Sequence, residues 1–308
     1  MPLDLFNELT QLMPQVLEPR YRAMKFENGV LIPTMVDLDP GIKEIAYPEI
    51  KQIGDAEIMS DAATDIPMVQ ITGSYNRYPV YMMMSSFPVT FQESRLLSRT
   101  IIDGIEQRMT VARIVIVQRT NMITALGKTG MNFDGALTNP LIAVDDSTVN
   151  VYTDTYQNVL DFFVSTVESL TGNYVTDEPS DMLINSDQHA LMISLENAQG
   201  TRNIKQRLQE IFPGLTITKI PEGEAAYIDG AISRPSAGKD RIFLYPKEAR
   251  IIHRHLEAAI ADLVPEEYTR TATIDGQVAR VYMMFSCLTP AIVNFPNDCR
   301  YVDIPVRA

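Results

Sequence analysis

The feature that most constrains this chain is a proline-free stretch from Thr90 to Leu126 with helical periodicity. Thr90 followed by Glu93 is typical of a capping box, and Gly127 is a suitable C-terminal stop. The stretch therefore predicts one helix of about 55 Å, at about 1.5 Å per residue, which is longer than a compact domain needs. Apolar residues recur every three or four positions along one face: Leu97, Ile101, Ile105, Met109, Ala112 and Ile116.

Part of this stretch also fits a second interpretation. Residues 114–117 read Ile-Val-Ile-Val, and a β-branched run favours a strand on propensity alone. A strand at this position is therefore the alternative to the long helix. Charged residues line another face of the predicted helix: Arg95, Arg99, Asp103 and Glu106.

The first 18 residues predict a short amphipathic helix, with Leu5, Leu9, Leu12 and Val16 at helical spacing. A helix this short is not stable alone and needs a surface to lie on. It either caps the core of its own chain or forms an arm that reaches a neighbouring subunit.

Residues 32–84 predict a long two-stranded excursion. Apolar segments at Ile50–Ile53 and at Val69–Ile71, continued by Tyr78–Met84, flank a polar middle with too little apolar content to be buried. An isolated hairpin is marginal in water, so this arm needs support, which in an assembly comes from another subunit. The polar middle comprises Gly54, Asp55, Glu57, Asp61, Asp65 and Pro67.

Two turn motifs follow the predicted helix. Gly127-Lys128-Thr129-Gly130 resembles the end of a phosphate-binding loop, but that motif requires a glycine at position 122, where Met122 stands, and a helix after it. Residues 135–140, Gly-Ala-Leu-Thr-Asn-Pro, predict a reversal of the chain.

The second half predicts a small α/β layer followed by strands. A helix at Asp154–Leu170 precedes a strand, helix, strand order and a further strand. Residues 247–263 fit either a helix or a strand that leaves one layer for another. Asp275-Gly276 predicts a hairpin between residues 272–274 and 278–288. The remaining predicted elements are a helix at 201–212 and strands at 182–184, 215–220, 241–245, 291–295 and 301–304.

Charge and cysteine content exclude some classes of function. With 26 basic and 39 acidic residues the net charge is −13, which repels phosphate and argues against a nucleic-acid-binding surface. Two cysteines, Cys287 and Cys299, do not make a disulfide framework, and we expect both to be buried apolar residues. There is no apolar run long enough for a membrane span and no export signal, so we expect a soluble protein made in the cytoplasm.

The sequence shows no familiar catalytic constellation. His253 and His255 could share one side of a strand and hold a metal, but no cysteine or carboxylate stands at ligand spacing nearby, so a polar surface is the simpler interpretation. The acidic doublets at 145–146 and 266–267 are interpreted as solvated surface. We therefore expect no catalytic, cofactor or metal site. The methionine clusters at 82–84 and 283–284 suit subunit contacts that must adapt to different neighbours.

The order of these parts resembles a known family. An N-terminal arm, a long hairpin with an acidic tip, a long helix, an α/β layer and a return to strands are similar to the major capsid proteins of tailed bacteriophages, which have the Hong Kong 97-like fold. The residues that carry the resemblance lie at 54–56 with 63–67, at Val89–Glu93 before the long helix, and at Gly135–Pro140 after it. The last segment matches the corresponding exit of that family only in part.

The resemblance implies an α+β fold with named parts. These are an N-arm at 1–31, an extended β-hairpin or E-loop at 32–84, a P-domain at 85–150 and 246–308 that carries the spine helix, and an α/β A-domain at 151–245. The short segment before the E-loop implies a separate scaffold or none. The helical periodicity of 247–263 departs from the P-domain strand that the family has there.

The resemblance also implies a function. Members of the family form pentamers and hexamers of an icosahedral shell that encloses the phage genome, so the expected location is the virion, with assembly in the host cytoplasm. The expected partners are further copies of the chain, with separate scaffolding, portal or decoration proteins possible, and with DNA enclosed but not gripped. The candidate inter-subunit contacts are Lys51, Asp55, Glu57, Asp61, Asp65, Glu93, Arg95, Arg99, Asp103 and Arg119.

Two other functions stay open at this stage. One is a shell of the same fold around a protein cargo, an encapsulin-like compartment. The other is an unrecognised enzyme, which would be a compact monomer with a deep pocket.

Overall fold

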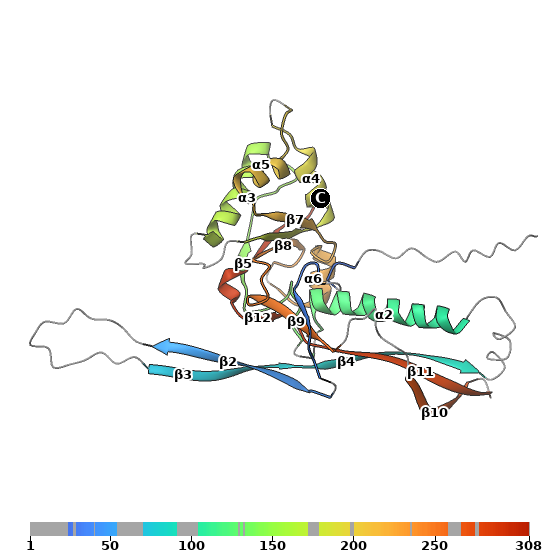
Figure 1. The fold of residues 1–308 in the computed structure, drawn as a ribbon. Coiled ribbons are helices and arrows are strands. Elements are labelled where there is room, and N and C mark those ends of the chain that lie inside the picture. Colours follow the sequence, from blue (N-terminus) through green and yellow to red (C-terminus); the bar gives the residue numbers. More distant parts are fainter. Residues whose placement is uncertain are drawn as a thin grey trace, which may run out of the picture.

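The computed structural model describes most of the chain, and its strands form three sheets (Figure 1). The described residues are 24–26, 29–39, 41–53, 70–90, 104–128, 130–131, 133–171, 179–197, 200–234, 236–257, 266–274 and 277–307.

One sheet has five strands in the order β5-β13-β8-β6-β7 and is covered on both faces. Alternate residues of a strand point to opposite faces. In β8, Ile242 and Leu244 pack with helices α3, α4 and α5, whereas Phe243 and Tyr245 pack with α6 and the end of α2. Burial on both faces explains the continuous apolar character of these strands. The elements are β5 Ala143–Asp146, α3 Tyr156–Thr171, β6 Asp181–Ile184, α4 Ser186–Ser194, α5 Ile204–Ile211, β7 Thr216–Lys219, α6 Ala225–Ala231, β8 Lys239–Tyr245 and β13 Arg300–Pro305.

The predicted α/β layer is present in this sheet, with additions. β6 and β7 pair in parallel and are joined through α4 and α5. Asn203 caps α5, its side chain accepting from the N–H of Gln206, so this helix begins three residues later than predicted. Helices α4 and α6 and strand β5 were not predicted, because each is short and none has a long apolar period.

The second sheet carries the long helix. Its main order is β1-β9-β11-β10, with β4 paired to β11 and β12 paired to β9. Helix α2 lies along β4 (Figure 1), where Ala112 and Ile116 pack against Phe87, Val89 and Met284. The elements are β1 Thr34–Val36, β4 Tyr81–Thr90, α2 Gly104–Leu126, β9 Ile252–Leu256, β10 Glu266–Ile274, β11 Gln277–Leu288 and β12 Ile292–Val293, followed by the short 3-10 helix η2 Pro296–Asp298.

The predicted start of the long helix at Thr90 is wrong. Strand β4 continues through Thr90, which pairs with Ala279 of β11. Phe87 and Val89 are two positions apart and both point to the buried side of that strand. This alternation is typical of a strand, and it continues to the point where the capping pattern predicted a helix start. Glu93 and the rest of residues 91–103 lie outside the described residues. The described helix has 23 residues, and the β-branched run at 114–117 is helical within it.

The C-terminal end of α2 is fixed by two glycines. Gly127 has a φ of 69° and its N–H donates to the carbonyl of Ile123, as expected for a helix stop. Gly135 lies so close that a Cβ there would stand 2.3 Å from the nitrogen of Gly127. Thr138 then donates to the carbonyl of Leu126, so residues 135–140 reverse the chain as predicted. Because a helix precedes Gly127, the phosphate-loop interpretation is excluded here.

We expect Gly135→Ala to prevent normal packing of this helix end. The new methyl group would overlap backbone atoms, which cannot move aside as a side chain can, so the free energy of unfolding should fall by about 3 kcal/mol or more. Urea denaturation of the soluble subunit measures this change. Gly214→Ala is the matched control, because a Cβ at Gly214 meets nothing within 4 Å, and an equal loss in both variants would contradict the explanation.

The C-terminal part of the chain shows which of the two interpretations of residues 247–263 is correct. Residues 252–256 form β9, so the strand alternative within 247–263 holds, and residues 258–263 lie outside the description. The predicted hairpin is confirmed by the pairing of β10 with β11, including Ala272 with Ala279 and Ile274 with Gln277. The strands predicted at 291–295 and 301–304 correspond to β12 and β13.

Several other expectations can be placed on the structure. Cys287 and Cys299 are free and buried, as predicted. The predicted N-terminal helix at 1–18 and the acidic tip of the excursion are not among the described residues. None of the described helices combines the length and the apolar character that a membrane crossing requires.

Candidate functional site

The excursion predicted at residues 32–84 contains a long hairpin that forms a sheet of its own (Figure 1). Strands β2 Glu44–Ile53 and β3 Gln70–Pro79 are antiparallel and pair at ten positions, from Glu44 with Pro79 to Ile53 with Gln70. None of the side chains described in these strands is buried, and Tyr75 is 70% exposed. The described part of the hairpin therefore contributes little to the core of the chain.

A cluster of aromatic side chains joins the base of the hairpin to the body. The hydroxyl oxygen of Tyr47, in β2, lies 2.9 Å from Nε2 of His253 and 2.5 Å from Nε2 of His255. Nδ1 of His255 lies 2.5 Å from a carboxylate oxygen of Asp37. The sequence suggested a polar surface for the two histidines, but only 2% and 4% of their surface is exposed. Both lie on one side of β9, and their partners come from distant parts of the chain.

Burial shapes the titration of this cluster. It lowers the pKa of His253 to about 4, and the neighbouring His255 adds to the effect. Burial also raises the pKa of Tyr47, with a further contribution from the charge of Asp37. Both groups are therefore held in their neutral forms at neutral pH.

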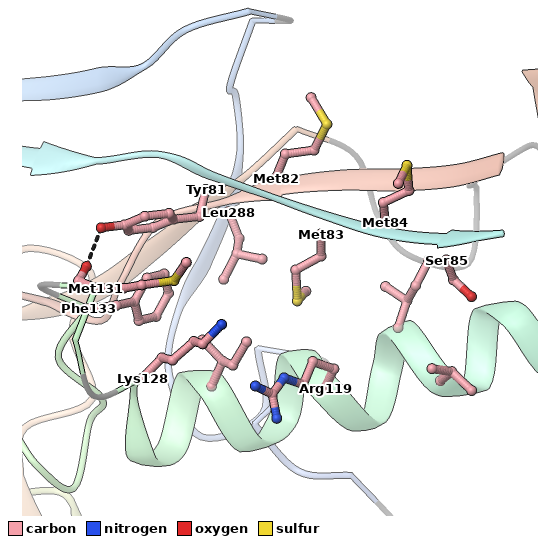
Figure 2. Close-up of a pocket in the computed structure, with 13 residues that line it drawn as sticks. Tyr81, Met82, Met83, Met84, Ser85, Arg119, Lys128, Met131, Phe133 and Leu288 are labelled. Atoms are coloured by element: carbon pink, nitrogen blue, oxygen red, sulfur yellow. Dashed lines mark hydrogen bonds between the residues drawn. The ribbon is translucent and has the colours of Figure 1, made fainter. Parts of the chain in front are cut away.

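A groove of about 220 Å³ lies between β4 and α2 (Figure 2). Met83 points from β4 toward α2, and Phe133 and Leu288 close one end. Arg119 and Lys128, both exposed, stand at its edge on the helix side. The lining is therefore largely apolar with a cationic edge, which suits an apolar or acidic segment better than a reaction.

Methionines continue this apolar character onto the other side of β4. Met82 and Met84 point away from α2 (Figure 2), and they are 64% and 60% exposed. Exposed flexible methionines adapt to more than one partner shape. Their exposure leaves the subunit contact predicted for residues 82–84 a prediction.

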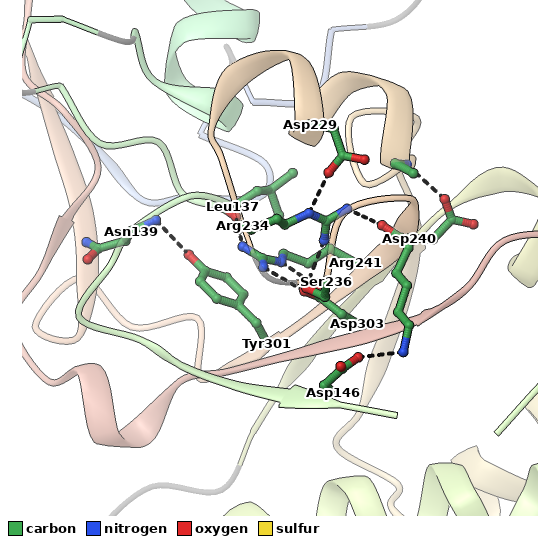
Figure 3. A network of polar contacts seen from close by, with 12 residues as sticks. Leu137, Asn139, Asp146, Asp229, Arg234, Ser236, Asp240, Arg241, Tyr301 and Asp303 are labelled. Carbon is green, nitrogen blue, oxygen red and sulfur yellow. Dashed lines mark hydrogen bonds and ion pairs between the residues drawn. The ribbon is translucent and has the colours of Figure 1, made fainter. Parts of the chain in front are cut away.

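A buried ionic network ties the body together (Figure 3). Asp303 is fully buried in β13, and Arg241 of β8 contacts both of its carboxylate oxygens, at 2.7 and 2.8 Å. Arg234 lies 3.0 Å from the same carboxylate, and Ser236 donates to it. Arg241 also donates to the carbonyl of Leu137 at 2.8 Å, so the network holds the loop that follows α2.

The charges in this network compensate one another. Burial alone would raise the pKa of Asp303, but hydrogen bonds and charge from Arg241, the hydroxyl of Ser236 and the charge of Arg234 hold that pKa below its ordinary value. The carboxylate therefore stays ionised, and the network has a structural role. The sequence carried only a weak signal for it: Asp303 is the one charge among the apolar residues 301–304, but Arg241 directly follows Lys239 and Asp240 and looks like the charged end of a strand.

Two of the ten predicted contact residues fall among those that the structure describes. Lys51 lies in β2, opposite Thr72, and Arg119 lies at the edge of the groove. These two residues lie on separate elements, β2 and α2. The other eight are outside the described residues: Asp55, Glu57, Asp61, Asp65, Glu93, Arg95, Arg99 and Asp103.

Other expected surface groups have partners. The doublet at 145–146 lies in β5, where Asp145 pairs with Arg300 and Asp146 pairs with Lys239. Among the side chains that the structure describes, no group of three histidine, cysteine, aspartate or glutamate residues is arranged to hold a metal ion.

This architecture was compared with protein families, with curated proteins and with solved structures. No family model matches the sequence, and no curated protein matches it. The structure is similar to "The capsid of Myoviridae Phage XM1", with a TM-score of 0.76 and 11% identity over 96% of this chain and 97% of the other. The chain has the Hong Kong 97-like fold of phage capsid proteins.

Two further structures agree with this fold. The capsid of a native GTA particle matches with a TM-score of 0.67 and 10% identity, over 97% of this chain and 96% of the other. A structure from Mycobacterium phage Bobi matches with a TM-score of 0.64 and 12% identity, over 99% and 98%. Near-complete coverage on both sides means that the hairpin, the long helix and the α/β layer of the Hong Kong 97-like fold are matched together. The fold expected from the sequence is confirmed.

Proposed function

We propose that this chain is a major capsid protein that assembles through pentamers and hexamers into an icosahedral shell around a phage genome. The observation that carries the proposal is the match of nearly the whole chain to phage capsid structures. The hairpin also supports the proposal, because none of its described side chains is buried. A two-stranded hairpin is only marginally stable alone in water, and contact with another copy of the chain would stabilise it.

The proposed parts of the subunit follow the predicted boundaries. The N-arm is 1–31, the E-loop is 32–84, the P-domain is 85–150 with 246–308, and the A-domain is 151–245. In this division the two-stranded sheet of β2 and β3 belongs to the E-loop. The five-stranded sheet is built mainly from the A-domain, with β5 and β13 contributed by the P-domain.

The contacts that hold the shell are proposed to be extensive. Obligate contacts between subunits bury more than about 2,000 Å², and charges at their edges set register more than affinity. The predicted contact residues are all charged, as this role requires. We place the described ones, Lys51 and Arg119, at contacts between copies.

Arg119 offers a direct test of the groove as a contact. We expect Arg119→Glu to leave the subunit folded, because the side chain is exposed, but to raise the concentration needed for assembly by about tenfold, equivalent to about 1.4 kcal/mol. Sedimentation of particles at a series of protein concentrations measures this. The control is Arg307→Glu, which makes the same charge change at another exposed residue. If both variants need the same protein concentration for assembly, the groove is not an assembly contact.

The proposed relation to DNA is enclosure without strong binding. A net charge of −13 repels phosphate, so the shell would confine the genome by surrounding it. The proposed location is the virion, after assembly in the host cytoplasm, and separate scaffolding, portal or decoration proteins are the proposed additional partners.

Electron microscopy of the purified protein tests the proposal. We expect closed shells built from rings of five and six subunits, and nuclease-resistant DNA inside particles purified from their natural source. A species near 35 kDa that never assembles would overturn the proposal. Shells that contain a protein cargo in place of DNA would indicate a compartment of the same fold.

A further inference from the structure

The sequence His253-Arg254-His255 places two histidines on one side of a strand, because side chains alternate along β9. Arg254 points to the other side, where it donates to Thr34 and Thr124. Both histidine rings pack against the ring of Tyr47, with centroids 5.4 and 6.1 Å away. One residue of the hairpin therefore faces two titratable groups of the body.

The hydrogen bonds of this cluster have a defined direction. The Asp37 carboxylate only accepts, so Nδ1–H of His255 donates to it, and Nε2 of a neutral His255 is an acceptor. The hydroxyl of Tyr47 then donates to Nε2 of His255, and its oxygen accepts from Nε2–H of His253. The resulting chain runs from His253 through Tyr47 and His255 to Asp37. It requires Nε2 of His255 to carry no proton, whereas Nε2–H of His253 donates whether or not that ring is protonated.

The cluster has few other charges around it. Tyr78 of β3 lies 6.2 Å from Tyr47, ring to ring, and Glu49 of β2 acts on Tyr78. On the body side, the hydroxyl of Thr289 accepts from the backbone N–H of His255, and Ile292 of β12 pairs with His253. Among the side chains that the structure describes, the titratable groups that face Tyr47 are therefore Asp37, Tyr78 and the two histidines.

We propose that the chain from His253 through Tyr47 and His255 to Asp37 is a protonation-sensitive latch that holds the hairpin at a set angle to the body. A proton added to Nε2 of His255 removes the acceptor of the Tyr47 hydroxyl. The Tyr47 oxygen then faces two N–H donors, and its own O–H has no acceptor. The latch acts within one subunit and does not depend on the proposed shell.

The pH range in which the latch weakens follows from the buried ring of His253. A second proton on this ring goes to Nδ1, which leaves the hydrogen bond to Tyr47 intact but places a charge in a buried site. Burial lowers the pKa of His253 to about 4 from its ordinary value, so its neutral form is favoured in the folded protein. The stability that this form contributes is fully present above a pH of about 6.5 and is lost as the pH falls toward about 4. Acidification should therefore weaken the contact between the hairpin and β9.

Distance measurements between spin labels test the latch in the full-length unassembled subunit. Tyr75→Cys on the hairpin and Leu141→Cys on the body are suitable sites, since these side chains are 70% and 65% exposed and both natural cysteines are buried. At about pH 8 we expect one narrow distance distribution, and at about pH 4.5 a distribution at least about twofold wider.

Two single substitutions make the test specific. Tyr47→Phe removes the hydroxyl and keeps the ring, so the distribution should be wide at both pH values. Tyr78→Phe is the matched control on the neighbouring strand and should behave like the parent protein. The latch is overturned if the parent distribution does not change with pH, or if Tyr47→Phe keeps the same change. If circular dichroism shows unfolding at the lower pH, the comparison at about pH 8 decides alone, and equal widths there overturn the latch.

Discussion

Removal of residues 54–66 is expected to abolish shell formation and to leave the subunit folded. These residues join β2 to β3, and the ten paired positions of the hairpin lie outside the deletion. Among the side chains that the structure describes, neither apolar core of the five-stranded sheet contains a residue from β2 or β3. The circular-dichroism spectrum should therefore stay close to that of the parent protein, while sedimentation should find no particles. Loss of the spectrum would show that the tip supports the fold of its own subunit.

A charge-neutral variant separates the length of the tip from its acidity. Asp55, Glu57, Asp61 and Asp65 can be replaced together by Asn or Gln without shortening the chain. If the acids set the register of the contact, this variant should assemble slowly or into irregular particles. Normal shells from it would assign the contact to the apolar and backbone groups of the tip.

Asp303→Ala is expected to cause the largest loss of stability. The change leaves Arg241 and Arg234 buried, each 3% exposed in its side chain, without the carboxylate that both contact. Breaking a buried ion pair by removing one partner costs about 3–5 kcal/mol, because the remaining charge is uncompensated. Urea denaturation of the soluble subunit should show this loss as a lower midpoint.

The control is a pair at the surface of the same sheet. Asp145 is 48% exposed and pairs with Arg300, so Asp145→Ala should cost at most about 1 kcal/mol. Similar losses at Asp145 and Asp303 would contradict the explanation by burial. The pKa of Asp303 is lowered, so its contribution is present above the ordinary aspartate pKa of about 3.9 and is lost as the pH falls through the lower value.

The order and type of the longer elements could be predicted from local patterns. The period of the apolar residues identified α2 and α3, and Asp275-Gly276 identified the pairing of β10 with β11. Gly127 marked the end of α2, because a positive φ at a helix end is easiest for glycine. Each of these features depends only on residues that are close together in the sequence, so the sequence alone is enough to predict it.

Local patterns were misleading where a segment pairs with a strand that is distant in the sequence. Thr90 and Glu93 fit a helix start, but Thr90 pairs with Ala279, almost 190 residues away along the chain, and continues β4. Residues 247–263 fitted either a helix or a strand, and residues 252–256 within them form β9, which pairs with β1 and β12. A pairing partner that is distant in sequence adds a ladder of hydrogen bonds that no local pattern reveals.

Composition and short-range periodicity in the sequence by itself determined the hairpin arm, the long helix and the absence of a familiar catalytic motif. The fold class was expected from the resemblance of these parts to the major capsid proteins of tailed bacteriophages. Only the tertiary structure brought Tyr47 to the two histidines and Arg241 to Asp303. These residues lie 206, 208 and 62 positions apart. Their meeting depends on how β2, β8, β9 and β13 pack, and burial then gives the contacts their strength by removing water from around the charges and hydroxyls.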